Sequence, residues 1–413
     1  MESHSLISAL HAKYSDHEPI HCEIFVPKSA PGKTESGNIR VPTQLVLQCF
    51  NIEQAGNPEE VAALCGHIQE LDLSHNQLSD WKQVFVMLQQ MPHLCVLNLS
   101  QNPLGSSTFE AVIGQLFPSI SVLALNDTQV PWSTLSQLLA IFPSLTELHI
   151  SCNNYQQVEL QEGHHSGVKV LHFNSNRLTE WADVCMLGRA FPSLDTLIMV
   201  EADIRSLDPA HHIPTTFPNL RSLNLSQGSI SSWPELEKLN KFPCLTDIRI
   251  QKLPLLEELE EEQRRALVLA YLPRITRLNG SQVEDTEREN AERAFIRRFM
   301  DQEDKPDRYY ELEEQYGKLE RLAEVDLQPR DHAKVTVEYQ GHEETMYINL
   351  NQTVSQLKKS LQNVAKLPVS RMQLYHLEVQ LPCGATECKY PKKMLYSLPV
   401  RDGDKFFIEE RPS

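Results

Sequence analysis

Apolar residues recur along the first two thirds of this chain with a period in the twenties. Nine apolar residues each open a copy of the pattern L-x-x-L-x-L-x-x-N-x-L, at intervals of 23 to 30 residues: Ile68, Leu94, Ile120, Leu145, Val168, Leu194, Leu220, Leu245 and Ile275. A pair made of an apolar residue and proline precedes most of them, and proline there ends a helix before the next strand begins. The pattern predicts a stacked array of strand–helix units.

This pattern is typical of leucine-rich repeats, in which each unit gives one strand and a helical return segment. Residues 42–67 fit a degenerate first repeat, with residues 57–65 as its short helix. The asparagine position of the pattern holds Asn76, Asn102, Thr128, Asn153 and Asn176, and then Ala202, Gly228 and Leu253. Asparagine bonds backbone groups of the turn after each strand, so we expect a less regular ladder in the later repeats.

The four tryptophans follow the same period, at Trp81, Trp132, Trp181 and Trp233. We expect them to pack into the core where each return helix begins. The nearby Ser79, Thr179 and Ser232 are candidate helix N-caps, and Ser232 with Glu235 matches a capping box. A last strand near Ile275 and an amphipathic helix to about residue 300 would close the solenoid, which we assign to residues 42–300, after an N-terminal segment 1–41.

The periodicity changes to two after a charged linker at residues 301–331. Strands are expected at 333–340, 344–350, 372–377 and 404–410, with a helix after the second and a turn at Asp402-Gly403. This order is that of a β-grasp and resembles ubiquitin-like domains, here residues 332–413. The predicted fold class is therefore α/β: a leucine-rich repeat solenoid with a parallel sheet on its concave face, and a C-terminal α+β ubiquitin-like domain.

The charge of the chain argues against polyanionic partners. It carries 38 basic and 55 acidic residues, a net charge of −17, so we expect neither nucleic acid nor a membrane as partner. No signal peptide and no membrane span is expected from the sequence. The nine cysteines have no framework spacing, which favours reduced thiols and a cytoplasmic location.

Motifs that could carry catalysis are weak. The Gly-Lys-Thr at 32–34 lacks the earlier glycine of a phosphate-binding loop, since that position holds Pro27. The histidine pairs 164–165 and 211–212, and Cys383 with Cys388, lack further ligands at metal-binding spacing. We therefore expect no enzyme activity, no cofactor and no metal.

The concave face is the candidate binding surface. In each strand the residue between the second and third apolar anchors points away from the core. The candidate partner-binding residues in this column are Asp72, Asn98, His149, His172, Ile198, Asn224 and Arg249. Valines and an isoleucine in and beside this column favour a protein-binding face over an inert one.

The repeats, the cap segment LPRITRLNGSQVEDTERENAERAFIRRF and the terminal domain together resemble the tubulin-folding cofactor E family from about residue 40 onwards. The family's N-terminal glycine-rich cytoskeleton-associated domain has no match in the first 40 residues, so the chain resembles a relative without it. The resemblance implies a cytoplasmic, cytoskeleton-associated protein that binds α-tubulin, destabilises αβ-tubulin dimers and promotes tubulin turnover. The acidic concave face would repel tubulin's acidic tails, which points to a folded tubulin surface instead.

The ubiquitin-like domain departs from ubiquitin in two respects. The sequence ends in EERPS without a Gly-Gly tail, so conjugation is not expected. Tyr375 occupies the position of the isoleucine at the centre of ubiquitin's hydrophobic patch, so this domain could contact the client or dock the proteasome. An alternative for the whole chain is a leucine-rich repeat adaptor, such as a phosphatase regulatory subunit, with another client.

Overall fold

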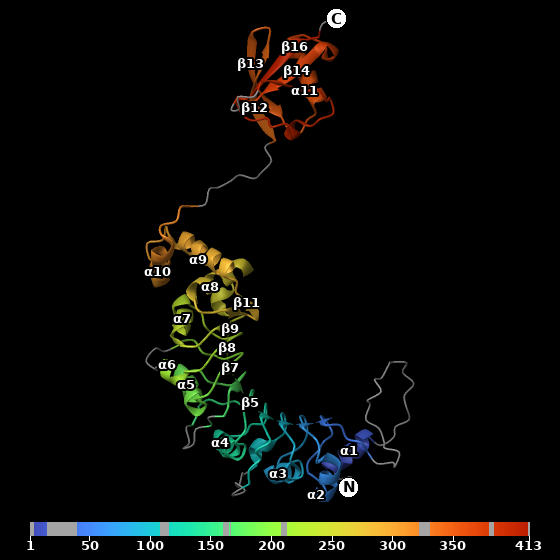
Figure 1. The fold of residues 1–413 in the computed structure, drawn as a ribbon, viewed down its shortest axis with the longest axis vertical. Helices are drawn as coiled ribbons and strands as arrows, with labels where there is room; N and C mark the ends of the chain where they lie inside the picture. The colour runs from blue at the N-terminus through green and yellow to red at the C-terminus, as the bar shows by residue number, and fades with distance from the viewer. Residues whose placement is uncertain are drawn as a thin grey trace. The chain divides into compact units, whose positions relative to one another are not determined.

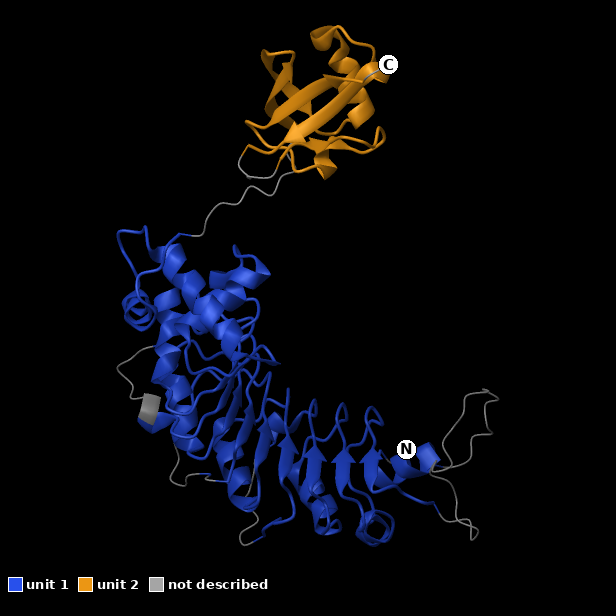
Figure 2. Cartoon of the chain, turned by 45° about the horizontal axis from the view of Figure 1, so that its top comes forward, with its two compact units in different colours: residues 1–321 blue, residues 322–413 orange. Residues whose placement is uncertain are grey.

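The chain folds into two compact units, residues 1–321 and 322–413, in a computed structural model (Figure 2). The structure describes residues 4–14, 39–107, 115–159, 165, 167–207, 213–321, 331–379 and 384–411. Each unit has its own hydrophobic core, so each is described separately.

The first unit is built on an 11-stranded sheet whose strands follow one another in chain order. The strands are β1 (Gln44–Val46), β2 (Glu70–Asp72), β3 (Val96–Asn98), β4 (Val122–Ala124), β5 (Glu147–His149), β6 (Val170–His172), β7 (Thr196–Ile198), β8 (Ser222–Asn224), β9 (Asp247–Arg249), β10 (Arg277–Leu278) and β11 (Ser281–Gln282). Neighbours from β1 to β10 pair in parallel, and β11 pairs antiparallel with β10. This is the predicted leucine-rich repeat solenoid.

The return segments lie on the opposite side of the sheet, so the strands line the inner side of the curve (Figures 1 and 2). They are α2 (Pro58–Cys65), α3 (Trp81–Gln89), η1 (Leu104–Ser106), α4 (Trp132–Ile141), α5 (Trp181–Ala190), α6 (Ile213–Thr216), α7 (Trp233–Glu237), η2 (Lys238–Lys241) and η3 (Pro254–Leu256). A helix is wider than the spacing of two strands, about 4.8 Å, which bends the stack towards the strand side.

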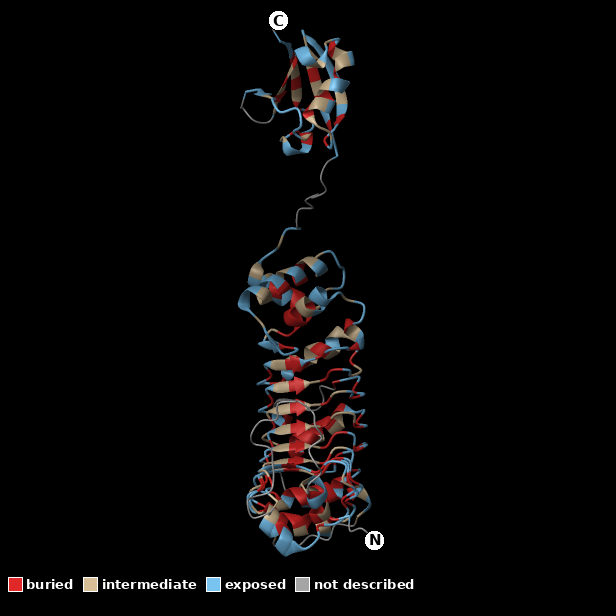
Figure 3. Ribbon diagram, turned by 90° about the vertical axis from the view of Figure 1, so that its right-hand side faces the viewer, coloured by how far each residue is buried: buried red, intermediate tan, exposed pale blue. Residues whose placement is uncertain are grey.

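Each three-residue strand, from β1 to β9, buries its middle residue, such as Leu97, Leu148 or Leu223. The residues on either side of it are mostly half-buried (Figure 3). Because side chains alternate along a strand, these residues point to the concave side. The nine repeat anchors are all buried, which confirms the register of the sequence pattern.

The asparagine ladder forms as predicted in the first repeats. The Asn102 amide donates to the carbonyls of Leu73 and Leu99, each at 2.9 Å, and Thr128 donates to Leu125 at 2.9 Å. The expectation of a less regular ladder is wrong for β7, β8 and β9, which pair with the same three-residue register. After β9 the pairing shortens to two residues.

A backbone contact explains why the ladder survives without asparagine. The residue before the asparagine position has a positive φ in every one of these turns, from His75 (55°) to Gln227 (59°). Its N–H donates to the next repeat's backbone, for instance Gln227 to Gln251 at 2.8 Å. This bond needs no particular side chain at the next position, where Gly228 stands.

The tryptophans occupy the predicted places. Each is the first residue of α3, α4, α5 or α7, and Trp81, Trp132 and Trp181 are buried. Trp233 is half-buried and stacks on Tyr271 with a ring separation of 4.8 Å.

Two of the predicted N-caps are wrong, and the third makes no cap bond. Asp80 caps α3 in place of Ser79, and Glu180 rather than Thr179 precedes α5. Ser232 precedes α7, but its side chain makes no cap bond. The Glu235 carboxylate, which the predicted capping box would direct to Ser232, accepts from the Leu207 backbone at 2.7 Å. Only Asp80 replaces a predicted cap with a side-chain bond of its own, since Glu180 makes none.

Helices cover both ends of the first unit. Helix α1 (Leu6–Tyr14) lies in the N-terminal segment, buries Leu6 and Leu10 in the solenoid core, and bridges to the first repeat through Ser5 and Gln54. At the other end lie α8 (Glu261–Tyr271), α9 (Asp285–Phe299) and α10 (Asp307–Tyr316). Helix α10 falls in the expected charged linker, yet its Tyr309 and Leu312 belong to the solenoid core.

The second unit is a β-grasp. Its sheet has the order β13 (His342–Asn349), β12 (His332–Tyr339), β16 (Lys405–Glu410), β14 (Met372–Leu377), β15 (Thr386–Glu387). The central pair β12–β16 is parallel, and helices α11 (Val354–Ser360) and α12 (Gln362–Ala365) follow β13, with η4 (Val369–Arg371) and η5 (Leu395–Ser397) as short turns. Helix α11 carries a complete capping box between Thr353 and Gln356. The predicted ubiquitin-like fold is present.

Candidate protein-binding face

The concave face of the first unit consists of two columns of side chains. The first residues of neighbouring strands pair with one another, and so do the third residues, as in Asp72 with Asn98 and His149 with His172. All seven candidate residues predicted from the sequence therefore lie in one continuous column.

Three of the seven also stabilise their own turns. The side-chain oxygens of Asp72, Asn98 and Asn224 accept the backbone N–H two residues further on, at 2.8 to 3.0 Å. The Asn98 amide also donates to Asp72 at 3.1 Å. Substitution of these three would disturb the solenoid itself, so they are poor probes of binding.

Ile198 and Arg249 are better probes. Ile198 is half-buried at the end of β7, and Arg249 is exposed at the end of β9. In the other column Val96, Val122 and Val170 are also half-buried. Half-buried branched side chains beside charged ones are the mixture found in protein-binding surfaces.

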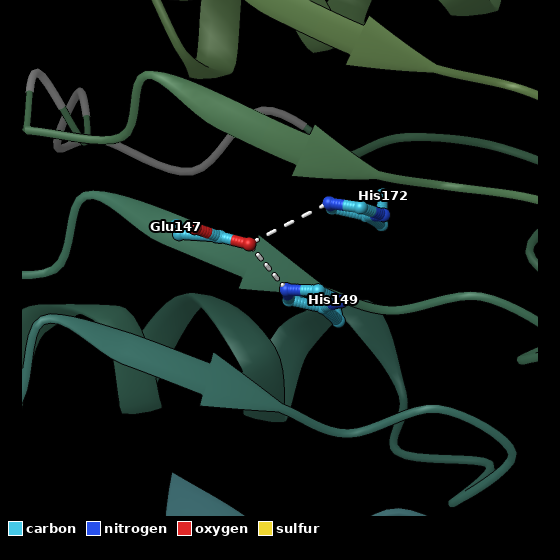
Figure 4. A group of neighbouring side chains, drawn as sticks. All are labelled: Glu147, His149 and His172. Atoms are coloured by element: carbon cyan, nitrogen blue, oxygen red, sulfur yellow. Dashed lines mark hydrogen bonds and ion pairs between the residues drawn. The ribbon is translucent and has the colours of Figure 1, made fainter. Parts of the chain in front are cut away.

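The middle of the face holds a compact polar group (Figure 4). On β5, Glu147 and His149 are two residues apart and so point to the same side. On β6, His172 pairs with His149, and the two imidazoles stack at 3.9 Å with only 9° between their planes. The Oε1 atom of Glu147 lies 2.7 Å from Nε2 of His149 and 3.6 Å from Nε2 of His172.

Electrostatics in this group favour a neutral His172. Burial and the neighbouring His149 lower the pKa of His172, and the negative charge of Glu147 offsets part of that effect. The sequence placed both histidines in one column but missed Glu147 as their partner. The available signal was a carboxylate two residues before a histidine on a strand, with another histidine at the same repeat position one strand later.

A cavity of about 940 Å³ lies at the C-terminal end of the solenoid. Lys252, Glu257, Glu261, Arg264 and Arg265 contribute opposite charges to its lining. Arg264 donates to the carbonyls of Glu257 and Leu259, and Arg265 pairs with Glu287. The guanidinium groups therefore stabilise the cap of the solenoid.

The other predicted chemical motifs contribute little to the described surface. The Gly-Lys-Thr segment, His164, His211, His212 and Cys383 lie outside the described residues. Burial raises the pKa of the Cys65 thiol to about 12 and that of Cys388 to about 11, so neither is a nucleophile near neutral pH.

In the second unit, Tyr375 lies on the outer face of β14, half-buried and opposite Phe407 of β16. Burial, and then the charges of Glu409 and Glu387, raise the pKa of Tyr375. The aromatic pair therefore forms a small apolar spot beside negative charges. This is where a ubiquitin-like patch was predicted.

The chain is similar to known proteins both within single repeats and over nearly its whole length. The model for the Leucine Rich repeat family matches residues 65–80. A rat protein, tubulin-specific chaperone cofactor E-like protein, is 41% identical over 391 residues, which cover 94% of this chain and 92% of the rat protein. This chain belongs to the tubulin-specific chaperone cofactor E-like family.

The chain is also similar, at lower identity, to proteins named tubulin-specific chaperone E. Bovine tubulin-specific chaperone E is 26% identical over 86% of this chain and 74% of its own length. The solved C-terminal ubiquitin-like domain of mouse tubulin-specific chaperone e is 20% identical and covers 20% of this chain and 87% of that domain, with a TM-score of 0.18. The predicted resemblance to the cofactor E family is confirmed by the 41% identical rat relative.

No helix within the described ranges combines the length and the apolar character that a bilayer-spanning segment requires.

Proposed function

We propose that this chain is a tubulin-binding regulator without enzymatic activity, which works in the cytoplasm in association with the cytoskeleton. The observation that carries the proposal is the 41% identity over 94% of the chain to proteins named tubulin-specific chaperone cofactor E-like. The finer proposal is that it binds α-tubulin, destabilises the αβ-tubulin dimer and promotes tubulin turnover. Microtubule stability would fall as free dimer is removed.

The concave face is the proposed client site. Its half-buried Val96, Val122 and Ile198, together with the exposed Arg249, support contact with a folded protein surface. Dissociation of a dimer needs no catalytic group. It needs tighter binding to released α-tubulin than to the dimer, and a shift of the equilibrium from 1:99 to 99:1 requires a preference of about 10⁴-fold.

Size-exclusion chromatography of this protein mixed with αβ-tubulin tests the proposal. Tubulin should move into a new complex that contains α-tubulin, with β-tubulin released. The variants Ile198→Glu and Arg249→Glu should weaken the complex at least tenfold. Lys82→Glu is the matched control, because Lys82 is exposed in the first turn of α3 on the helical side.

If the tubulin dimer elutes unchanged, the dissociation proposal fails, and the adaptor hypothesis with another client replaces it. The ubiquitin-like domain has a separate role in the proposal, as a docking module for the client or the proteasome. Tyr375→Ser should reduce that docking and leave the tubulin complex of the solenoid intact.

A further inference from the structure

The geometry of the concave centre points to a metal site: we propose that Glu147, His149 and His172 bind one divalent transition-metal ion, Zn²⁺ in particular. Their three ligand atoms all lie within 4.8 Å of one another. All three side chains belong to neighbouring strands of one rigid sheet and face the same side (Figure 4). The proposal is independent of which protein the solenoid binds.

The ligand set selects the kind of metal. Two imidazoles and one carboxylate suit Zn²⁺ and its first-row neighbours, whereas Mg²⁺ and Ca²⁺ prefer shells made of oxygen atoms. Three protein ligands that leave a further position open are the arrangement of reactive zinc sites. The side chains are 24%, 26% and 35% exposed for His149, His172 and Glu147, so an ion can reach them from the concave side.

Small side-chain movements are enough to complete the site. Zinc lies about 2.0–2.2 Å from its nitrogen and oxygen ligands, so the ion would take the place of the contact between Glu147 and His149. The stacked imidazoles must turn out of their parallel arrangement, because a metal ion lies in the plane of each ring that binds it. The strand register holds the three backbones in place, so the rings can turn without movement of the sheet.

The charges around the group change when the metal ion binds. Only neutral imidazoles offer a nitrogen lone pair, so the ion binds the form in which both histidines are unprotonated. The concave positions on β4, Val122 and Ala124, and on β7, Thr196 and Ile198, carry no charge. A bound Zn²⁺ would therefore change this part of the face from one negative charge to one positive charge, and leave a coordination position for water or for a partner's side chain.

The full-length protein is first freed of metal with a chelator. It is then titrated with Zn²⁺ in competition with a colorimetric zinc indicator, which measures the number of sites and their affinity and so tests the proposal. One saturable site is expected. Loss of an outer-shell partner already weakens metal sites by about 10–100-fold, so His149→Asn and His172→Asn should weaken this one by at least about 100-fold. Glu147→Gln should weaken it to a lesser degree. His93→Asn, which changes an exposed histidine outside the group, should leave it unchanged.

The cysteines of the chain could bind Zn²⁺ in place of the proposed site. Spectra of the Co²⁺-substituted protein distinguish thiolate ligands from histidine and carboxylate ligands. A cobalt complex of the proposed site shows visible d–d bands without a sulfur-to-cobalt charge-transfer band. The proposal is overturned if no saturable site appears, if His149→Asn and His172→Asn bind Zn²⁺ as tightly as the parent, or if the cobalt spectrum shows thiolate ligands. Circular dichroism verifies that each variant is folded, and Glu147→Gln, an isosteric change, keeps the test decisive if a histidine variant unfolds.

Discussion

Arg308 of α10 lies 3.1 Å from Glu292 of α9, and the two side chains are only 10% and 4% exposed. The Arg308 guanidinium also donates to the carbonyl of Ala270 in α8 at 2.8 Å, and the Tyr316 hydroxyl donates to Glu292 at 2.6 Å. One buried ion pair thus joins the three helices that close the solenoid.

Removal of one partner of this pair should be costly. Arg308→Met leaves Glu292 buried without its counter-ion, which typically costs about 3–5 kcal/mol. We expect faster hydrogen exchange throughout α9 and α10 and a lower urea midpoint by tryptophan fluorescence. All four tryptophans lie in the first unit, so this signal excludes the ubiquitin-like domain.

Arg321→Met is the control for that experiment. Arg321 pairs with Asp301 at 2.8 Å, but the two side chains are 75% and 63% exposed, and such pairs contribute about 0–1 kcal/mol. Equal destabilisation by the two variants would show that the buried pair does not hold the cap together.

The asparagine ladder gives a second prediction. Asn102→Ala removes the amide donor to the Leu99 carbonyl and the acceptor of the Leu78 N–H, whereas the Leu73 carbonyl keeps the Asn76 amide as a donor. We expect a loss of about 1–3 kcal/mol in the free energy of unfolding. Asn219→Ala is the control, because Asn219 is exposed and bonds one carbonyl. Urea unfolding measures the free energy of unfolding of both variants. A smaller loss for Asn102→Ala than for Asn219→Ala would contradict the prediction.

The imidazole of His172 should titrate below the ordinary value of 6.5 in metal-free protein. The unfolded chain then binds the proton more tightly than the folded chain does. The contribution of His172 to the free energy of unfolding should therefore fall as the pH drops below 6.5 and stay constant above it. Glu147→Gln should lower the pKa of His172 further, since it removes the favourable charge. NMR titration of the histidine ring protons, assigned with His172→Asn, measures these shifts, and a pKa above 6.5 would refute them.

The second unit should fold alone, because it has its own core. Within it, buried Asp404 accepts from His376 at 2.9 Å and from the Arg401 backbone at 2.8 Å. In a protein made of residues 331–411, Asp404→Ala should cost about 2–4 kcal/mol, since it leaves the buried His376 without its carboxylate partner. Glu343→Ala, which breaks an exposed contact with Lys405, serves as the control in thermal unfolding.

The sequence was enough to predict the solenoid because every repeat imposes the same burial at the same positions. Anchors such as Leu97 and Leu148 specify one face of each strand, and nine recurrences outweigh any local deviation. Helix α10 was not predicted, because Pro306 and the many charges concealed an apolar side formed by Tyr309 and Leu312.

The candidate site was predicted only in part. The column of concave residues follows from the repeat, so His149 and His172 were found. Glu147 was missed as the partner of the two histidines because it lies in the other column of the concave face. The contact depends on side-chain directions across both columns, and the sequence pattern does not specify these directions. The second role of Asp72, Asn98 and Asn224 in their own turns also depends on local geometry that the pattern does not encode.

The covered ends of the sheet give the inner face a fixed length. Helix α1 packs beside the first repeat, and the antiparallel β11 with the helices after it follows the last parallel strand, so the parallel stack ends at both places. Ten parallel strands at a spacing of about 4.8 Å give an inner surface about 43 Å long. A client that covers the whole of the proposed binding face would therefore need a surface of similar length.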